Sequence, residues 1–203
     1  MNTQDAITQR RSVKHYDPEH QFTDEEFNIL FSHALLSPTS FNIQNWRFVN
    51  VTDPELRKSI RAAAWDQGQV TDASILLVMC ADIKAWEKDP GRYWANSGPQ
   101  AQEMIVPMID AFYRNKEQLQ HDEGLRSIGI VAQTLMLTAK SMGYDSCPMI
   151  GFDPDSVAKI IQLPEDHMVG MLLAIGKSTR DANPRGGQLP LEEVLIENQF
   201  STN

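Results

Sequence analysis

The stretch from Asp122 to Met142 restricts the fold more than any other part of the sequence. It predicts one long helix that is apolar on most of its sides, and Gly143 follows in a position where glycine commonly ends a helix. Its apolar residues are Leu125, Ile128, Ile130, Val131, Leu135 and Leu137. Such a helix lies at the centre of a fold or in a subunit interface, while the charges of Arg126 and Lys140 argue against a membrane span.

Around this helix, the sequence predicts strands and helices that alternate loosely, without regular β-α-β units. Strands are expected at 46–51, 74–81, 146–150 and 168–175. The strand at 74–81 is a continuous apolar run, which is typical of a strand buried on both faces. Helices are expected at 3–10, from Thr23, from Asp53, at 99–118 and at 154–161, with another short one near 191–195. Pro107 should kink the helix at 99–118 or break it in two.

Composition and charge narrow the functional class. The chain has 203 residues, of which 41% are hydrophobic, and we expect residues 1–203 to form one domain. A net charge of -9 argues against a nucleic acid or an anionic membrane as partner, including a nucleic-acid-binding arm built on Arg10, Arg11 and Lys14. Cys80 and Cys147 have no CxxC pattern and resemble reduced thiols. Without an apolar signal region or a bilayer-length run, the chain is expected to be cytoplasmic.

Known sequence motifs exclude several kinds of site. No GxGxxG follows a strand and no Walker-type loop is present, so a Rossmann or P-loop nucleotide site is not expected. The histidines show neither HxxxH nor HExxH spacing, and we therefore assign no metal ligands. They are His15, His20, His33, His121 and His167.

Two N-terminal segments carry residues suited to a ligand. The first is Arg10-Arg11-Ser12-Val13-Lys14, where alternate residues of an extended chain would point two cations and a hydroxyl at one phosphate and an electron-rich ring. The second is the run from Ser37 to Trp46, whose short polar side chains suit a polyol. Each has an ordinary alternative, because a solvated basic stretch or a loop of turn-forming residues would look the same.

Two further segments lie near the C-terminus. Cys147 to Phe152 contains a proline followed by a glycine at a strand end, where backbone can approach a ligand closely. The tail from Lys177 carries Arg180 and Arg185 among glycines and prolines, and one of these cations could complete a phosphate site. A plain turn and a surface loop are the respective alternatives.

Taken in order, these four segments resemble the nitroreductase family of FMN enzymes. The stretch Trp65-Asp66-Gln67-Gly68-Gln69-Val70 also fits the family pattern, and the resemblance extends from about Thr3 to Leu195. It implies an α+β fold with a mixed, mostly antiparallel sheet surrounded by helices. It also implies an intertwined homodimer with FMN at the subunit interface, the long helix in the dimer core, and residues 177–203 as an arm that wraps the partner.

The resemblance implies roles for individual residues within one subunit. Arg10, Arg11 and Ser12 are expected to hold the FMN phosphate and ribityl chain, and Lys14 to lie beside flavin N1 and O2. The pyrimidine edge should be contacted by Asp66 and Gln69. The flavin N5 and O4 edge should meet the segment of Pro148, Met149, Ile150 and Gly151, with backbone N–H groups donated by the last two. Lys177 or Arg185, with Arg185 favoured, should close the phosphate site.

The resemblance assigns further residues to the partner's flavin and to the substrate. The FMN of the other subunit should be reached by Pro38, Thr39, Ser40, Asn42 and Gln44. The second substrate should meet a wall formed by Phe41, Trp94, Met108, Phe112 and Tyr113, although the last four could equally be the core side of two helices. Two positions depart from the pattern: several relatives carry an acidic residue at Ile150 and an amide at Asp66. An ionised Asp66 can only accept hydrogen bonds.

The implied activity is that of an FMN-dependent NAD(P)H oxidoreductase. Hydride would pass from NAD(P)H through flavin N5 to a nitroaromatic, a quinone or a similar planar acceptor, by ping-pong exchange at one site. Lys14 would stabilise the negative charge that reduction places on N1 and O2. A flavin-binding carrier or sensor without steady-state turnover is the alternative. The sequence leaves open the physiological acceptor and the choice between NADH and NADPH.

Overall fold

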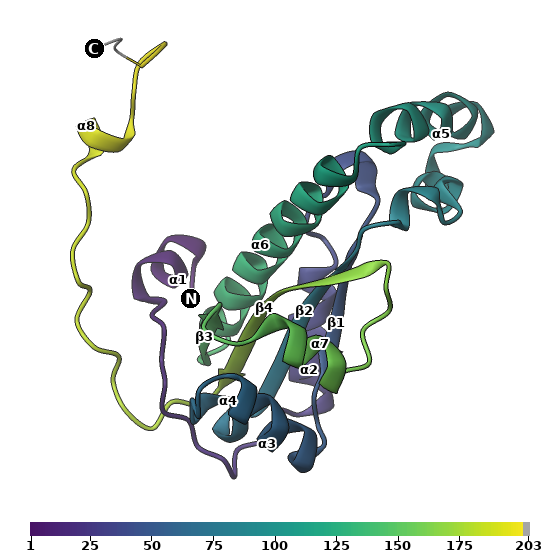
Figure 1. Ribbon diagram of the computed structural model, residues 1–203. Helices are drawn as coiled ribbons and strands as arrows, with labels where there is room; N and C mark the ends of the chain where they lie inside the picture. Colours follow the sequence, from purple (N-terminus) through teal and green to yellow (C-terminus); the bar gives the residue numbers. More distant parts are fainter. Residues whose placement is uncertain (201–203) are drawn as a thin grey trace.

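Four strands form one antiparallel sheet in the computed structural model, which describes residues 1–200 (Figure 1). They are β1 (Trp46–Asn50), β2 (Ile75–Asp82), β3 (Asp145–Met149) and β4 (His167–Gly176). Their order across the sheet is β1-β2-β4-β3, so β1 and β3 form the two edges. The N-terminal segment of the chain adds an isolated parallel bridge beside β3, which pairs Ser12 with Ser146.

The sheet is buried on both faces, as the apolar run at 74–81 predicts. Successive residues of β2 alternate between two cores, because side chains along a strand point to opposite sides. Leu76 and Val78 enter one core, and Leu77 and Met79 the other; all four are fully buried.

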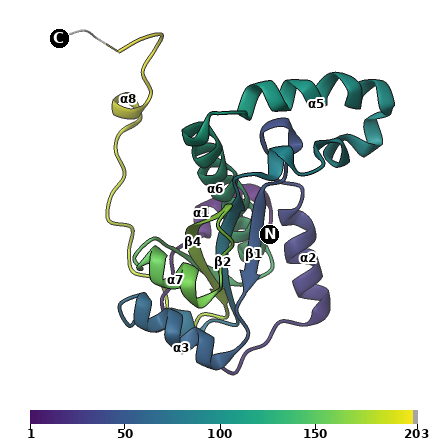
Figure 2. The same ribbon diagram turned by 45° about the vertical axis from the view of Figure 1, so that its right-hand side comes forward.

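Helices cover the two faces. The long helix α6 (Glu117–Ser141) packs across β2 and β4 together with α1 (Thr3–Gln9) and α2 (Asp24–Ala34). The opposite face carries α3 (Pro54–Ala63), α4 (Gln69–Asp72) and α7 (Pro154–Ile160), as Figure 2 shows. Local sequence sets where these helices begin. Thr23 and Glu26 form the predicted capping box, and Asp53 accepts hydrogen bonds from the first-turn N–H groups of α3.

A separate helical segment projects from one end of the sheet. It consists of the short helices η2 (Ala85–Glu87) and η3 (Pro90–Ser97), followed by α5 (Pro99–Tyr113). Pro107 was predicted either to kink this helix or to break it in two; the break does not occur, because α5 continues through this residue. Glu103 and Pro107 are both exposed, so the carbonyl that loses its donor can bond to water. The break lies instead at residues 114–116, and α6 therefore begins five residues before the expected Asp122.

Two apolar surfaces of the chain remain uncovered. Ile128 and Val131 of α6 are buried against the sheet, whereas Leu125 and Ile130 on its other side are each 43% exposed. The last part of the tail, which contains the label α8, extends away from the body of the molecule, as both ribbon views show (Figures 1 and 2). It contains the expected short helix as α8 (Leu191–Val194), and its large apolar residues are exposed: Leu189, Leu191, Val194, Leu195, Ile196 and Phe200. The last three residues of the expected arm lie outside the described residues.

The observed architecture is the α+β class expected from the sequence, and each strand lies within two residues of its predicted bounds. Within residues 1–200, no helix is long and apolar enough to cross a membrane.

Candidate functional site

The basic segment at residues 10–14 lies extended along edge strand β3. The N–H of Val13 donates to the carbonyl of Ser146 at 3.1 Å, next to the Ser12–Ser146 bridge. Val13 is buried in the core while Ser12 and Lys14 are exposed, which is the alternation that an extended chain requires. Arg11 donates to the carbonyl of Asn183 in the tail. The segment therefore offers one serine and two cations beside the sheet edge.

Arg10 and Lys14 have no carboxylate partner among residues 1–200. Nη1 of Arg10 is buried without a hydrogen-bond acceptor, and Lys14 makes no ion pair. Burial raises the pKa of the neighbouring Cys147 thiol, and the positive charges of Lys14 and Arg10 oppose that rise. A buried donor without an acceptor is costly, so the Arg10 guanidinium fits an anionic ligand.

The tail brings a third cation to the same place. Arg185 donates from Nη2 to the carbonyls of Thr8 and Arg10, at 3.1 and 3.0 Å. Lys177 lies farther along the first segment, where its carbonyl accepts from the N–H of Asp17 at 2.9 Å. Of the two expected tail ligands, Arg185 is thus the one held against Arg10.

The end of β3 presents unpaired backbone donors. Ile150 is 82% exposed, and within the described chain neither its N–H nor that of Gly151 donates to a protein group. Pro148 is half-buried and the Met149 side chain lies in the core, so their contribution to a ligand site would be limited mainly to backbone. The exposed backbone at 150–151 is therefore the available hydrogen-bonding edge.

The loop at residues 65–69 is tied to this edge. Nε2 of Gln67 donates to the carbonyl of Gly151 at 2.7 Å, and buried Gln69 donates to Gln67 at 3.0 Å. The Trp65 ring covers Gly151 so closely that a Cβ there would lie 3.0 Å from its Cζ3. Asp66 is exposed and forms an ion pair with Arg61 at 2.6 Å.

Trp65 and Gln67 were not assigned a role from the sequence. Both belong to the stretch that fits the family pattern, but their contacts with Gly151, more than 80 residues away, depend on the fold.

The polar loop at residues 38–45 lies at the other edge of the sheet, where it leads into β1. Its backbone is held by a hydrogen bond from the Gln44 N–H to Thr39 Oγ1 at 2.9 Å, and Pro38, Ser40 and Asn42 are at least partly exposed. Because β2 and β4 separate the two edges, this loop is about 14 Å or more from the β3 edge in one chain. One chain therefore does not bring the two residue groups together.

Both loops contain unusual backbone. Phe41, Asn42 and Gln44 have φ values of 50°, 55° and 43°, and Trp65 and Asp66 have values of 54° and 58°. Left-handed conformation costs energy for residues other than glycine, and such residues cluster at functional sites. The two loops are therefore candidates for ligand contact on grounds that do not depend on their sequence pattern.

The expected substrate wall forms a small aromatic cluster where the loop at 38–45 meets η3 and α5. Trp94 Nε1 donates to the Phe41 carbonyl at 3.0 Å, and the Phe41 and Phe112 rings lie 5.3 Å apart. Met108 and Phe112 are 50% and 38% exposed, whereas Tyr113 is fully buried in this cluster. Tyr113 thus supports the wall from behind. Phe41, Trp94 and Phe112 keep surface that a ligand can reach, and Met108 is an exposed residue of α5.

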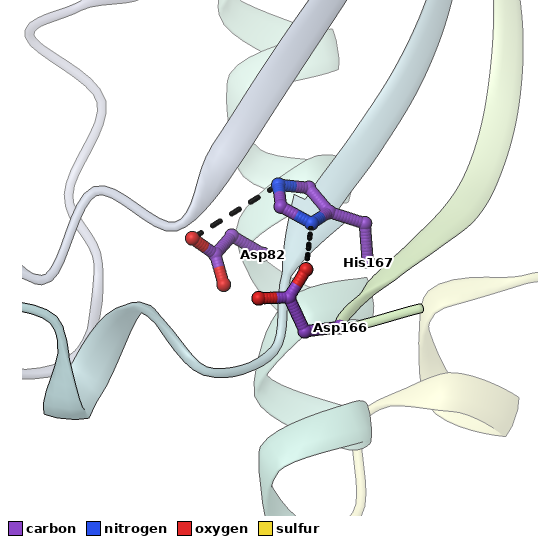
Figure 3. A group of neighbouring side chains, drawn as sticks. All are labelled: Asp82, Asp166 and His167. Carbon is purple, nitrogen blue, oxygen red and sulfur yellow. Dashed lines mark hydrogen bonds and ion pairs between the residues drawn. The ribbon is translucent and has the colours of Figure 1, made fainter. Parts of the chain in front are cut away.

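A charged cluster lies where β2 ends and β4 begins (Figure 3). Asp82, which is 3% exposed, lies 3.9 Å from Nε2 of His167, whose Nδ1 is 2.6 Å from Asp166. The Lys88 ammonium bridges both carboxylates, at 2.9 Å from Asp82 and 2.5 Å from Asp166, and together with His167 it lowers the pKa of Asp166 to about 2. Lys88 thus occupies the position that a metal ion would need. An ion-pair network explains the cluster without a metal.

The donors along the β3 edge fit a ligand that carries both a phosphate and a polar ring. Arg10 and Arg185 provide cations, Ser12 a hydroxyl, and residues 150–151 free N–H groups. The orphaned Arg10 nitrogen and the close approach at Gly151 are the observations that favour such a ligand over a purely structural role.

Comparison with known proteins identifies relatives over nearly the whole chain. Residues 7–177 match the sequence profile described as the nitroreductase family. Protein DrgA of Synechocystis is 52% identical over 200 residues, covering 96% of this chain and 95% of that protein. MhqN of Bacillus subtilis, provisionally named an NAD(P)H nitroreductase, is 32% identical and covers 93% and 95% of the two chains.

A solved structure gives the same result. A crystal structure from Exiguobacterium sibiricum, of a provisionally named nitroreductase in complex with FMN, superposes with a TM-score of 0.87. It is 28% identical, and the match covers 97% of each chain. The chain is thus similar to these proteins in both sequence and fold.

Proposed function

The chain belongs to the nitroreductase family, and from this membership we propose that it is an FMN-dependent oxidoreductase that takes hydride from NAD(P)H. Its acceptors would be nitroaromatics, quinones or similar planar molecules. The observation that carries the proposal is the β3 edge: Arg10 and Lys14, which have no carboxylate partner within residues 1–200, lie in the segment beside the strand that leads to the exposed N–H groups of residues 150–151. The FMN bound to the Exiguobacterium relative, and the NAD(P)H in the name of MhqN, support the two cofactors.

Within one chain, we assign the FMN phosphate to Arg10, Ser12 and Arg185. Two guanidinium groups and a hydroxyl match the charge and the acceptor oxygens of a phosphate. Arg11, which donates to the tail, would hold Asn183 and so keep Arg185 in place. The isoalloxazine edge would receive the backbone N–H groups of Ile150 and Gly151, while Gln69 and Asp66 remain candidates for its pyrimidine side.

A homodimer follows from the same assignment. The loop at 38–45 carries the second group of expected FMN contacts, yet it lies at the opposite edge of its own sheet. A second copy could supply this loop to the first copy's flavin. The exposed Leu125 and Ile130 on α6 and the apolar arm beyond Pro184 offer the additional surface that an obligate interface buries.

When bound, FMN supplies the hydride chemistry, and the chain supplies position and charge. Lys14 is exposed on the ligand side of the first segment and has no competing ion pair within residues 1–200. A fixed cation beside the flavin N1 and O2 region stabilises developing negative charge there by about 2 kcal/mol in a water-poor site. No protein acid or base is assigned to the reaction.

Steady-state kinetics test the proposal against its alternative. The purified protein, loaded with FMN, should oxidise NADH or NADPH through many turnovers when a quinone or a nitroaromatic is supplied. A protein that holds FMN but completes no turnover with either nicotinamide and any member of the acceptor panel would instead be a flavin carrier or sensor.

A further inference from the structure

A polar cavity of about 400 Å³ lies between the start of β1 and the short helix η3. Its walls are Gln44, Trp46, Arg47, Arg92 and Tyr93. None of these residues belongs to the β3 edge, and only Gln44 belongs to the loop at 38–45 that we assign to the partner's flavin. The cavity therefore shares Gln44 with that loop and is otherwise separate from the proposed flavin site and from the substrate wall.

Two arginines line this one cavity in a protein whose net charge is -9. The Arg92 guanidinium lies 5.6 Å from the Tyr93 ring and has no carboxylate partner within residues 1–200. Its charge is thus available to a ligand. Guanidinium groups bind phosphate oxygens in a bidentate geometry, which makes an arginine pair a recognition element for that group.

Arg47 is held in position by its surroundings. Its Nη1 donates to the carbonyls of Gln44 and Trp46 at 2.8 and 2.9 Å, and its Nη2 lies 3.4 Å from Asp82. Asp82 is shared with Lys88 at the shorter distance of 2.9 Å, so it neutralises Arg47 only in part. The cavity therefore combines one arginine fixed by the loop with one free to move onto a ligand.

We propose that this cavity binds a phosphate group of the dinucleotide hydride donor. The inference rests on the proposed function, because that function requires a donor with several negative charges to approach an acidic protein. The FMN phosphate is assigned to the opposite edge of the sheet and leaves these arginines unused. Gln44 connects the cavity to the loop that we assign to the partner's flavin, so a donor whose nicotinamide stacks on that flavin would have its phosphates near this cavity.

The phosphate could be the pyrophosphate common to both donors or the 2′-phosphate of NADPH. Binding of ADP-ribose and of 2′-phospho-ADP-ribose to the FMN-loaded dimer, measured by calorimetry, separates the two sources. Arg92→Ala should weaken binding by about fivefold, or about 1 kcal/mol for an exposed charge pair. An equal loss of affinity for both probes indicates that the cavity binds the pyrophosphate. A loss of affinity confined to 2′-phospho-ADP-ribose indicates that it binds the 2′-phosphate.

Two further variants complete the test. Arg92→Lys should keep part of the affinity, because it retains the charge but loses the bidentate geometry. Lys58→Ala, which removes an exposed charge on α3, should leave both dissociation constants unchanged. Michaelis constants for NADH and NADPH should follow the same pattern as the probes.

Two results would overturn the inference: wild-type protein that binds neither probe, or an Arg92→Ala variant with both dissociation constants within twofold of wild type. Either result can occur in a protein that NAD(P)H still reduces, so the proposed function would survive it. A protein that no nicotinamide reduces would contradict the proposed function, while the calorimetry would still report on the cavity.

Discussion

Replacing Gly151 by alanine tests how the loop at 65–69 controls the flavin edge. The new Cβ would lie 3.0 Å from Cζ3 of Trp65 and 3.4 Å from Nε2 of Gln67. Carbon atoms pack best at about 3.5–4.0 Å, so the ring must withdraw by roughly 0.5–1 Å. Gly151 is not in the left-handed region, and alanine therefore adds no backbone strain.

The displaced contacts are local. Trp65 is 70% exposed and can swing outward, so the free energy of unfolding should change by less than about 1 kcal/mol. Trp65 and Gln67 belong to the same loop, so withdrawal of the Trp65 ring should weaken the 2.7 Å hydrogen bond from Gln67 to the Gly151 carbonyl, which contributes about 1 kcal/mol. Because that bond fixes the peptide groups that face the flavin, we expect FMN to bind about fivefold more weakly.

The assay is a fluorescence titration of apoprotein with FMN, accompanied by urea denaturation. Gly151→Ala, Trp65→Ala and the double variant form a mutant cycle. Without the Trp65 ring the clash is absent, so the two substitutions should couple by at least about 0.5 kcal/mol in FMN binding. Additive effects, or an FMN dissociation constant within twofold of wild type in Gly151→Ala, would refute this reasoning.

Three other substitutions probe separate parts of the account. Lys14→Ala should lower the flavin reduction potential, because it removes the cation that favours the reduced form; an unchanged potential in spectroelectrochemistry would exclude that role. Arg57→Met removes the hydrogen bonds that Arg57 donates to the carbonyls of Val51 at 2.7 Å and Ser74 at 3.1 Å. It should lower the free energy of unfolding, measured by urea denaturation, by about 3 kcal/mol. A decrease below about 1 kcal/mol would show that water replaces the lost donors. The pKa of Asp166 is lowered to about 2, so its stabilisation is present above about pH 4 and is lost as the pH falls toward 2. Asp166→Asn should therefore melt below wild type at neutral pH, with the difference in Tm vanishing near pH 2; a difference independent of pH would contradict the ion-pair explanation.

Local sequence was sufficient to predict most of the helices and strands. The capping box at Thr23, the Asp53-Pro54 start and the two-sided apolar run of β2 each depend on neighbours within a few residues, and all three predictions were confirmed. The break that was one of the two outcomes predicted at Pro107 does not occur, because whether proline breaks a helix depends on whether the carbonyl four residues earlier can reach water. That is a property of the surface and not of the local sequence.

The candidate site could be predicted only in part, because it is formed by contacts between residues far apart in the sequence. The alternation at residues 10–14 was visible in the sequence, but the orphaned Arg10 nitrogen and the approach of Arg185 appear only after the tail and β3 are in place. The same holds for Gln67, which donates to Gly151, and for Tyr113, which the aromatic cluster buries. The arginine-lined cavity lies between β1 and η3, and no sequence motif predicts it.

An absorption spectrum of the purified, FMN-reconstituted protein under anaerobic conditions, recorded before and after addition of NADH or NADPH, shows whether the protein is an FMN-dependent oxidoreductase. We expect one FMN per chain, with flavin bands that bleach on addition of a nicotinamide and return when a quinone is added. A protein that binds no FMN, or whose bound FMN neither nicotinamide reduces, would contradict this expectation.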